Sequence, residues 1–90
     1  MARLIDAFIA TGRELGLDPE VARSLSLQTF YGTAKLLADT GMSPETLVEM
    51  VSSPKGTTVA GRKVLEVSDY AEVIEKTITA AARRSRELGR

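Results

Sequence analysis

Apolar side chains recur every three or four residues along almost the whole chain. This spacing places them on one face of an α-helix. We find no stretch that alternates as a strand does, and no segment that repeats another. The pattern therefore predicts an all-α fold, a small bundle of about five helices in one domain, residues 1–90. The last helix is expected to present Tyr70, Val73, Ile74, Thr77, Ile78, Ala81 and Leu88 on its apolar face.

Local start and stop signals divide this pattern into helices. Asp18-Pro19 and Ser43-Pro44 each combine a good N-cap residue with a proline suited to the first helical turn. Gly16 and Gly41 are suited to the C-terminal ends of the first and second helices. These signals predict where the first three helices are separated from one another.

The remaining helix signals lie in the second half of the chain and inside the second helix. A fourth helix is predicted from about Thr58 to Val67, and Asp69 with Glu72 has the spacing of a capping box before the fifth. Gly32 lies inside the second helix, where glycine costs about 1 kcal/mol relative to alanine. Two explanations stay open for it, close approach of a neighbouring helix or exposure to solvent.

Missing residue types exclude much chemistry. The chain has no Cys and no His, which removes thiolate nucleophiles, imidazole bases and the usual zinc sites, so no metal is expected. No apolar run is long enough to span a membrane, and no signal peptide is visible. We therefore expect a cytoplasmic protein without a membrane partner.

Charge is balanced, with 12 basic and 12 acidic residues and a formal net charge of zero. This balance argues against neutralisation of many phosphates and so against a nucleic-acid partner. Four arginines near the C-terminus prompt the alternative of a small nucleic-acid or regulatory module. The favourable interaction of cations with a helix C-terminus explains them more simply. They are Arg83, Arg84, Arg86 and Arg90.

The ends and the composition of the chain predict association with a partner. The first helix begins at or just after Met1 with no capping residue, which indicates either a start within the first helix of a longer polypeptide or a frayed terminus. The chain is 43% hydrophobic but only 4% aromatic, and a domain this small buries only roughly 60% of its unfolded surface. We therefore expect a homodimer or a larger assembly of the same chain.

The segment Ser52–Thr58 is the candidate site. Backbone N–H groups of Gly56, Thr57 and Thr58 could converge on a carboxylate at the positive end of the following helix. The hydroxyl of Thr58 could both donate and accept a hydrogen bond. Ser53-Pro54 alone would be ordinary capping chemistry, as it is at Ser43-Pro44.

The same segment resembles a known family. The run of nine residues from Ser53 to Gly61 is similar to Ser-Pro-Gly-Gly-Thr-Thr-x-Ala-Gly, a signature of pyrroline-5-carboxylate reductases. The resemblance extends along the chain through Gly16-Leu17, Gly32-Thr33-Ala34-Lys35, Val64-Leu65-Glu66 and the ending Ala81-Ala82-Arg83-Arg84-Ser85-Arg86-Glu87-Leu88-Gly89. It implies the C-terminal helical domain of such an enzyme, through which subunits form an interdigitating homodimer.

The resemblance also implies a reaction and a role for each site residue. The family transfers a hydride from NADPH or NADH to the C=N bond of 1-pyrroline-5-carboxylate, giving L-proline. The backbone of Gly56 and Thr57 would hold the substrate carboxylate, Ser53 would shape the pocket, and the Thr58 hydroxyl would contact the ring nitrogen as the catalytic residue. The cofactor, NADP or NAD, would be bound by an N-terminal Rossmann domain. This sequence has no G-x-G-x-x-G segment, so we expect the isolated chain to be inactive.

Two departures from the family pattern keep another interpretation open. Lys55 stands where the signature usually has glycine, and Arg62 stands where the family usually has an aliphatic residue. Lys55 favours the alternative of a non-catalytic helical dimerisation module, in which the loop only connects two helices. Arg62 puts the packing of the fourth helix in question.

Overall fold

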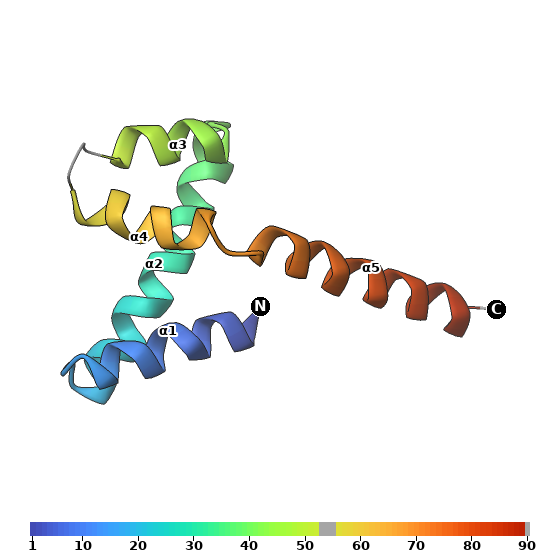
Figure 1. Ribbon diagram of the computed structural model, residues 1–90, viewed down its shortest axis with the longest axis horizontal. Coiled ribbons are helices and arrows are strands. Elements are labelled where there is room, and N and C mark those ends of the chain that lie inside the picture. The colour runs from blue at the N-terminus through green and yellow to red at the C-terminus, as the bar shows by residue number, and fades with distance from the viewer. Residues whose placement is uncertain (53–55, 90) are drawn as a thin grey trace. The chain divides into compact units, whose positions relative to one another are not determined.

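The computed structural model describes residues 1–52 and 56–89, and every regular element among them is a helix. The all-α prediction of five helices is confirmed (Figure 1). The chain divides into two compact units, Met1–Leu47 and Val48–Arg90. The helices are α1 (Ala2–Glu14), α2 (Pro19–Thr40), α3 (Pro44–Val51), α4 (Thr57–Glu66) and α5 (Tyr70–Leu88).

The predicted caps of α2 and α3 are confirmed. The Asp18 carboxylate accepts a hydrogen bond from the Glu20 N–H at 3.2 Å, and Pro19 is the first residue of α2. The hydroxyl of Ser43 accepts from the Thr46 N–H at 3.1 Å at the start of α3. Gly41 ends α2 with φ of +70°, a left-handed conformation that glycine adopts without steric cost.

The predicted capping box before α5 is wrong. Asp69 has φ of −95° and ψ of 24° and makes no side-chain cap, because a capping residue needs the extended conformation that aims its side chain at the first turn. The Ser68 hydroxyl instead accepts a hydrogen bond from the Tyr70 N–H at 3.3 Å. The Glu72 carboxylate lies 3.1 Å from the Lys76 ammonium, in an ion pair along the helix.

In the first unit, α1 packs against α2 through small residues. A Cβ atom added to Gly12 would lie 3.3 Å from the Ala22 Cβ and 3.3 Å from Leu17 Cδ1. Ala22 is only 1% exposed. Gly32, for which close helix approach and solvent exposure were both open, has no described atom within 4 Å of its own added Cβ. The close approach therefore occurs at Gly12.

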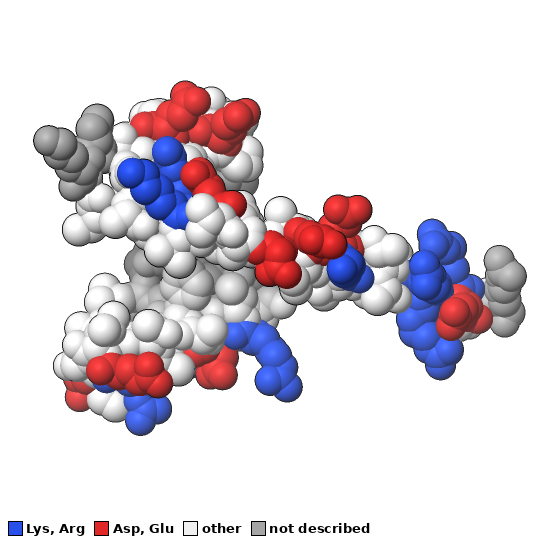
Figure 2. Space-filling model, viewed as in Figure 1, with Lys and Arg blue, Asp and Glu red and all other residues white. Residues whose placement is uncertain are grey.

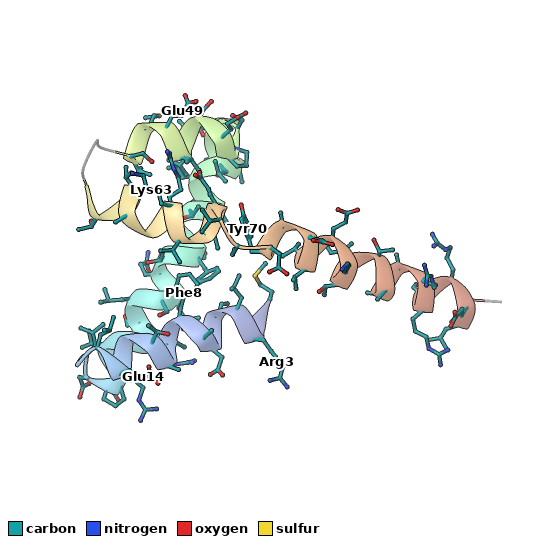
Figure 3. The ribbon with its side chains drawn as sticks, viewed as in Figure 1. Arg3, Phe8, Glu14, Glu49, Lys63 and Tyr70 are labelled. Carbon is teal, nitrogen blue, oxygen red and sulfur yellow. The ribbon has the colours of Figure 1, made fainter. Side chains whose placement is uncertain are left out.

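An aromatic pair extends the same contact. Phe8 points from α1 towards α2 (Figure 3). Its ring lies edge-to-face against the ring of Phe30, with centroids 5.0 Å apart and an interplanar angle of 76°. This arrangement is the one that aromatic quadrupoles favour. The pair joins the middle of α1 to the middle of α2.

Replacing Gly12 by leucine is expected to lower the free energy of unfolding by about 1–3 kcal/mol, because the added side chain would overlap Ala22 and Leu17. Urea unfolding followed by circular dichroism measures the change. Ala10→Leu is the matched control, since Ala10 is an exposed residue of the same helix. Equal stabilities for the two leucine variants would contradict the packing of α1 on α2 at Gly12.

Most large apolar side chains are not covered. Ala22 and Ser26 are the buried side chains of the described residues, at 1% and 8% exposure. On α5, the exposed fractions are 47% for Ile74, 64% for Ile78 and 68% for Leu88. Among the described residues, no helix combines the length and the apolar character that crossing a membrane requires. With these exposed fractions, the apolar face of α5 is a surface that a protein partner can cover.

Candidate functional site

The candidate site lies at the N-terminal end of α4. Gly56 is the residue that precedes the helix, Thr57 is its first residue and Thr58 its second. The structure therefore brings these three predicted residues together. The predictions for Ser53 and for Lys55 lie outside the described residues.

The backbone of Gly56 is in an ordinary extended conformation. Its φ of −79° and ψ of 167° are extended values that other residues also adopt. Glycine contributes here by having no side chain, so nothing attached to its Cα stands between the helix end and a ligand. A ligand atom can therefore approach the main chain closely at this position.

The first turn of α4 has hydrogen-bond donors to offer. The Ala60 N–H donates to the Gly56 carbonyl at 3.2 Å, so the N–H groups of Thr57, Thr58 and Val59 precede the first intrahelical bond. Among the described residues, no side chain caps this helix end, and the first turn carries no acidic residue. Converging N–H groups and the positive end of the helix macrodipole favour an anion such as a carboxylate.

One further residue of α4 makes contacts that sequence reasoning missed. Nη1 of Arg62 donates to the hydroxyl of Ser52 at 3.0 Å. Its Nε lies 3.1 Å from a carboxylate oxygen of Glu66, in an ion pair that is not aligned as a hydrogen bond. The hydroxyl of Ser52 in turn donates to the Val48 carbonyl. The i, i+4 spacing of Arg62 and Glu66 could have indicated the ion pair, but nothing local indicated Ser52.

A separate apolar groove of about 360 Å³ lies in the first unit. No charged side chain lines it, which suits an apolar side chain of a partner better than a charged substrate. Its lining residues are Phe8, Thr29, Phe30, Thr33, Ala34 and Leu37.

Basic side chains gather near the C-terminal end of α5 (Figure 2). Arg84 is paired with Glu87, at 3.1 Å between Nη1 and the carboxylate. Arg86 lies in the last turn, where a cation interacts favourably with the helix macrodipole. Along α4, Lys63 is a second basic residue beside Arg62 (Figure 3).

These features define a class of protein, a small helical domain with exposed apolar faces and an uncapped helix end suited to an anion. The chain belongs to the family described as pyrroline-5-carboxylate reductase dimerisation, whose model matches residues 1–88. A domain of this family associates with a copy of itself. The resemblance read from the sequence is confirmed.

Relatives named as pyrroline-5-carboxylate reductases come from bacteria and plants. Pyrroline-5-carboxylate reductase 1 of Bacillus subtilis is 44% identical over 85 residues, which are 94% of this chain and 29% of the relative. The Synechocystis protein is 41% identical over 90 residues, 100% of this chain and 34% of its own length. The Arabidopsis thaliana protein is 42% identical over 84 residues, 93% of this chain and 30% of its own length. The chain thus spans about a third of the length of these relatives.

Proposed function

We propose that this chain acts as the C-terminal helical domain of a pyrroline-5-carboxylate reductase. In that enzyme a hydride passes from NADPH or NADH to the C=N bond of 1-pyrroline-5-carboxylate, and the product is L-proline. The first turn of α4, which no described side chain caps, carries this proposal within a chain that matches the family over residues 1–88. The domain supplies the dimer interface and the loop that binds the substrate carboxylate.

The first turn of α4 performs the binding chemistry. The N–H groups of Gly56 and Thr57 hold the substrate carboxylate, and Ser53 shapes the same pocket. The hydroxyl of Thr58 contacts the ring nitrogen, and it can accept a hydrogen bond from a protonated nitrogen or donate one to a neutral nitrogen. Imine reduction mainly requires that the ring be held in one orientation, which neutral donors of this kind can provide.

The cofactor supplies the hydride, and we place its binding in an N-terminal Rossmann domain, as the family resemblance implies. The chain's own residues then fix the face and the orientation of the substrate. In this arrangement the isolated chain binds a five-membered carboxylate weakly and does not reduce it.

Self-association provides the other half of the function. The apolar face of α5 and the groove of the first unit are the surfaces that a second copy of the chain would bury. A symmetric dimer uses each surface twice, once in each subunit. We infer a homodimer or a larger assembly of the interdigitating type.

A chimera tests the catalytic proposal. It joins the N-terminal part of the Bacillus subtilis reductase 1 to this chain, in place of that enzyme's own matching segment. The chimera is expected to oxidise NADPH in the presence of pyrroline-5-carboxylate, and the isolated chain is expected to show no such activity. Spectrophotometry at the absorbance of NADPH measures both.

Each outcome of that experiment is informative. Activity of the isolated chain would contradict the placement of the cofactor outside it. A chimera that is dimeric by light scattering but inactive would contradict the catalytic proposal. It would favour instead a non-catalytic dimerisation module, the function that Lys55 in the signature suggests.

A further inference from the structure

Arg62 joins the end of α3 to α4. Ser52 directly follows the last residue of α3, and Arg62 lies in the second turn of α4. Their hydrogen bond of 3.0 Å links positions ten residues apart and is partly buried. It therefore links the residue that follows α3 to α4, whose first turn carries the candidate site.

Each of the two side chains in this contact also interacts with a second partner. The hydroxyl of Ser52 accepts from Arg62 and donates its own hydrogen to the Val48 carbonyl, which fixes its orientation. The guanidinium of Arg62 donates a hydrogen bond to Ser52 through Nη1, and its Nε forms an ion pair with the Glu66 carboxylate. Its side chain is 35% exposed. An aliphatic residue at this position would leave the Ser52 hydroxyl without this donor.

Arg62 is also close to the proposed catalytic residue. Thr58 and Arg62 are four residues apart on α4, so they lie on the same face of the helix. Helical side chains lean towards the N-terminus of their helix, so this spacing favours an Arg62 side chain directed towards the turn that contains Thr58. The two residues therefore belong to neighbouring turns of α4.

We propose that Arg62 is a positioning residue that, through Ser52, fixes the first turn of α4 so that its N–H groups point at the substrate carboxylate. The proposal rests on the proposed function, since it assigns Arg62 to the same site. It differs from a simple charge effect because Arg62 acts through a neutral hydroxyl. Small displacements of binding groups cost large factors in binding and rate, so this contact affects affinity without touching the ligand.

Nuclear magnetic resonance on the isolated chain tests the proposal with L-proline as the added ligand. In the wild type, L-proline is expected to shift the amide signals of Gly56, Thr57 and Thr58. Ser52→Ala and Arg62→Met are each expected to weaken this binding by about 10-fold, an estimate based on the cost of misplaced binding groups. The double variant is expected to bind like either single variant, because both changes remove the same contact. Arg62→Lys should recover part of the affinity.

A measurement without ligand accompanies the titration. Ser52→Ala and Arg62→Met are expected to lower the backbone order parameters of Thr57 and Thr58, which report motion of the first turn. Circular dichroism and light scattering are used to check that each variant keeps its helical content and its mass. Lys63→Met is the matched control, because it removes the neighbouring positive charge on the same helix.

The outcomes separate the positioning role from the proposed function. No binding of L-proline by the wild type would contradict the proposed function and the cradle that Arg62 is said to fix. Wild-type binding that both Ser52→Ala and Arg62→Met leave unchanged would overturn the positioning role alone. A loss in Arg62→Met with none in Ser52→Ala would also overturn it, since the effect would then come from charge.

Discussion

Replacing Thr58 by alanine is expected to lower kcat/KM of the chimera for pyrroline-5-carboxylate by about 100-fold, with most of the loss in kcat. The hydroxyl is the one side-chain group that we place against the reacting C=N bond. Removing it leaves the ring nitrogen without a hydrogen-bond partner as charge on that atom changes. Thr58→Ser keeps the hydroxyl and is expected to retain most of the activity. Steady-state kinetics with NADPH in excess gives both constants.

Thr57→Ala is the matched control for this prediction. Thr57 is the neighbouring residue in the first turn of α4, and we assign only its backbone N–H to the site. Its alanine variant is therefore expected to keep kcat within a factor of about 2, since its N–H remains in place. Equal losses for Thr57→Ala and Thr58→Ala would show that the first turn had been disturbed, and would contradict the specific role of the Thr58 hydroxyl.

The helix ends that could be predicted from sequence are those decided by neighbouring residues. Asp18 and Ser43 cap the helices that follow them, and α2 ends at Gly41 as predicted. In each case the interaction joins residues no more than four positions apart. Such interactions are properties of a short peptide, so a pattern of residue types indicates them without knowledge of the fold.

Predictions that depended on the direction of a side chain or on a distant neighbour were less successful. Asp69 and Glu72 have the right spacing for a capping box, but the backbone at Asp69 is not extended and Glu72 pairs with Lys76. Gly12 and Gly32 are both glycines inside helices. Local sequence does not say which of them faces a second helix, and the structure places the contact at Gly12.

In the candidate site, too, local features could be predicted from the sequence and contacts between distant residues could not. Its placement at the start of α4 follows from Gly56-Thr57-Thr58, because a glycine directly before a helical pattern marks where the helix begins. The contact between Arg62 and Ser52 could not be predicted in this way, since the two residues are ten positions apart and belong to different helical segments. The sequence presented Arg62 only as a departure from an aliphatic position. The structure shows that Arg62 donates a hydrogen bond to Ser52.

The second large effect is expected on the assembly. Ile78→Glu on α5 is expected to raise the dissociation constant of the homodimer by about 10²–10⁴-fold. Ile78 is 64% exposed, and it lies on the helical face that we assign to the interface with Ile74. Burying an isoleucine side chain contributes about 1.5–3 kcal/mol, and a two-fold axis applies each substitution twice. Each 1.4 kcal/mol corresponds to a factor of ten, which gives this range.

Thr79→Glu is the control that separates this effect from a general effect of added charge. Thr79 is the next residue of α5, and it lies among Glu75, Lys76 and Arg83 on the polar side of the helix. The same carboxylate placed there meets solvent and basic neighbours, so the dimer is expected to persist. Light scattering and sedimentation across a wide concentration range measure the mass of each variant. If the Ile78→Glu variant were still a dimer, the interface would not lie on this face of α5. A wild type with the mass of one chain at every concentration would contradict the homodimer itself.

Loss of the dimer should also reduce the helical circular dichroism signal of Ile78→Glu but not of Thr79→Glu. The reason is that a helix with so much exposed apolar surface has few packing contacts in its own unit.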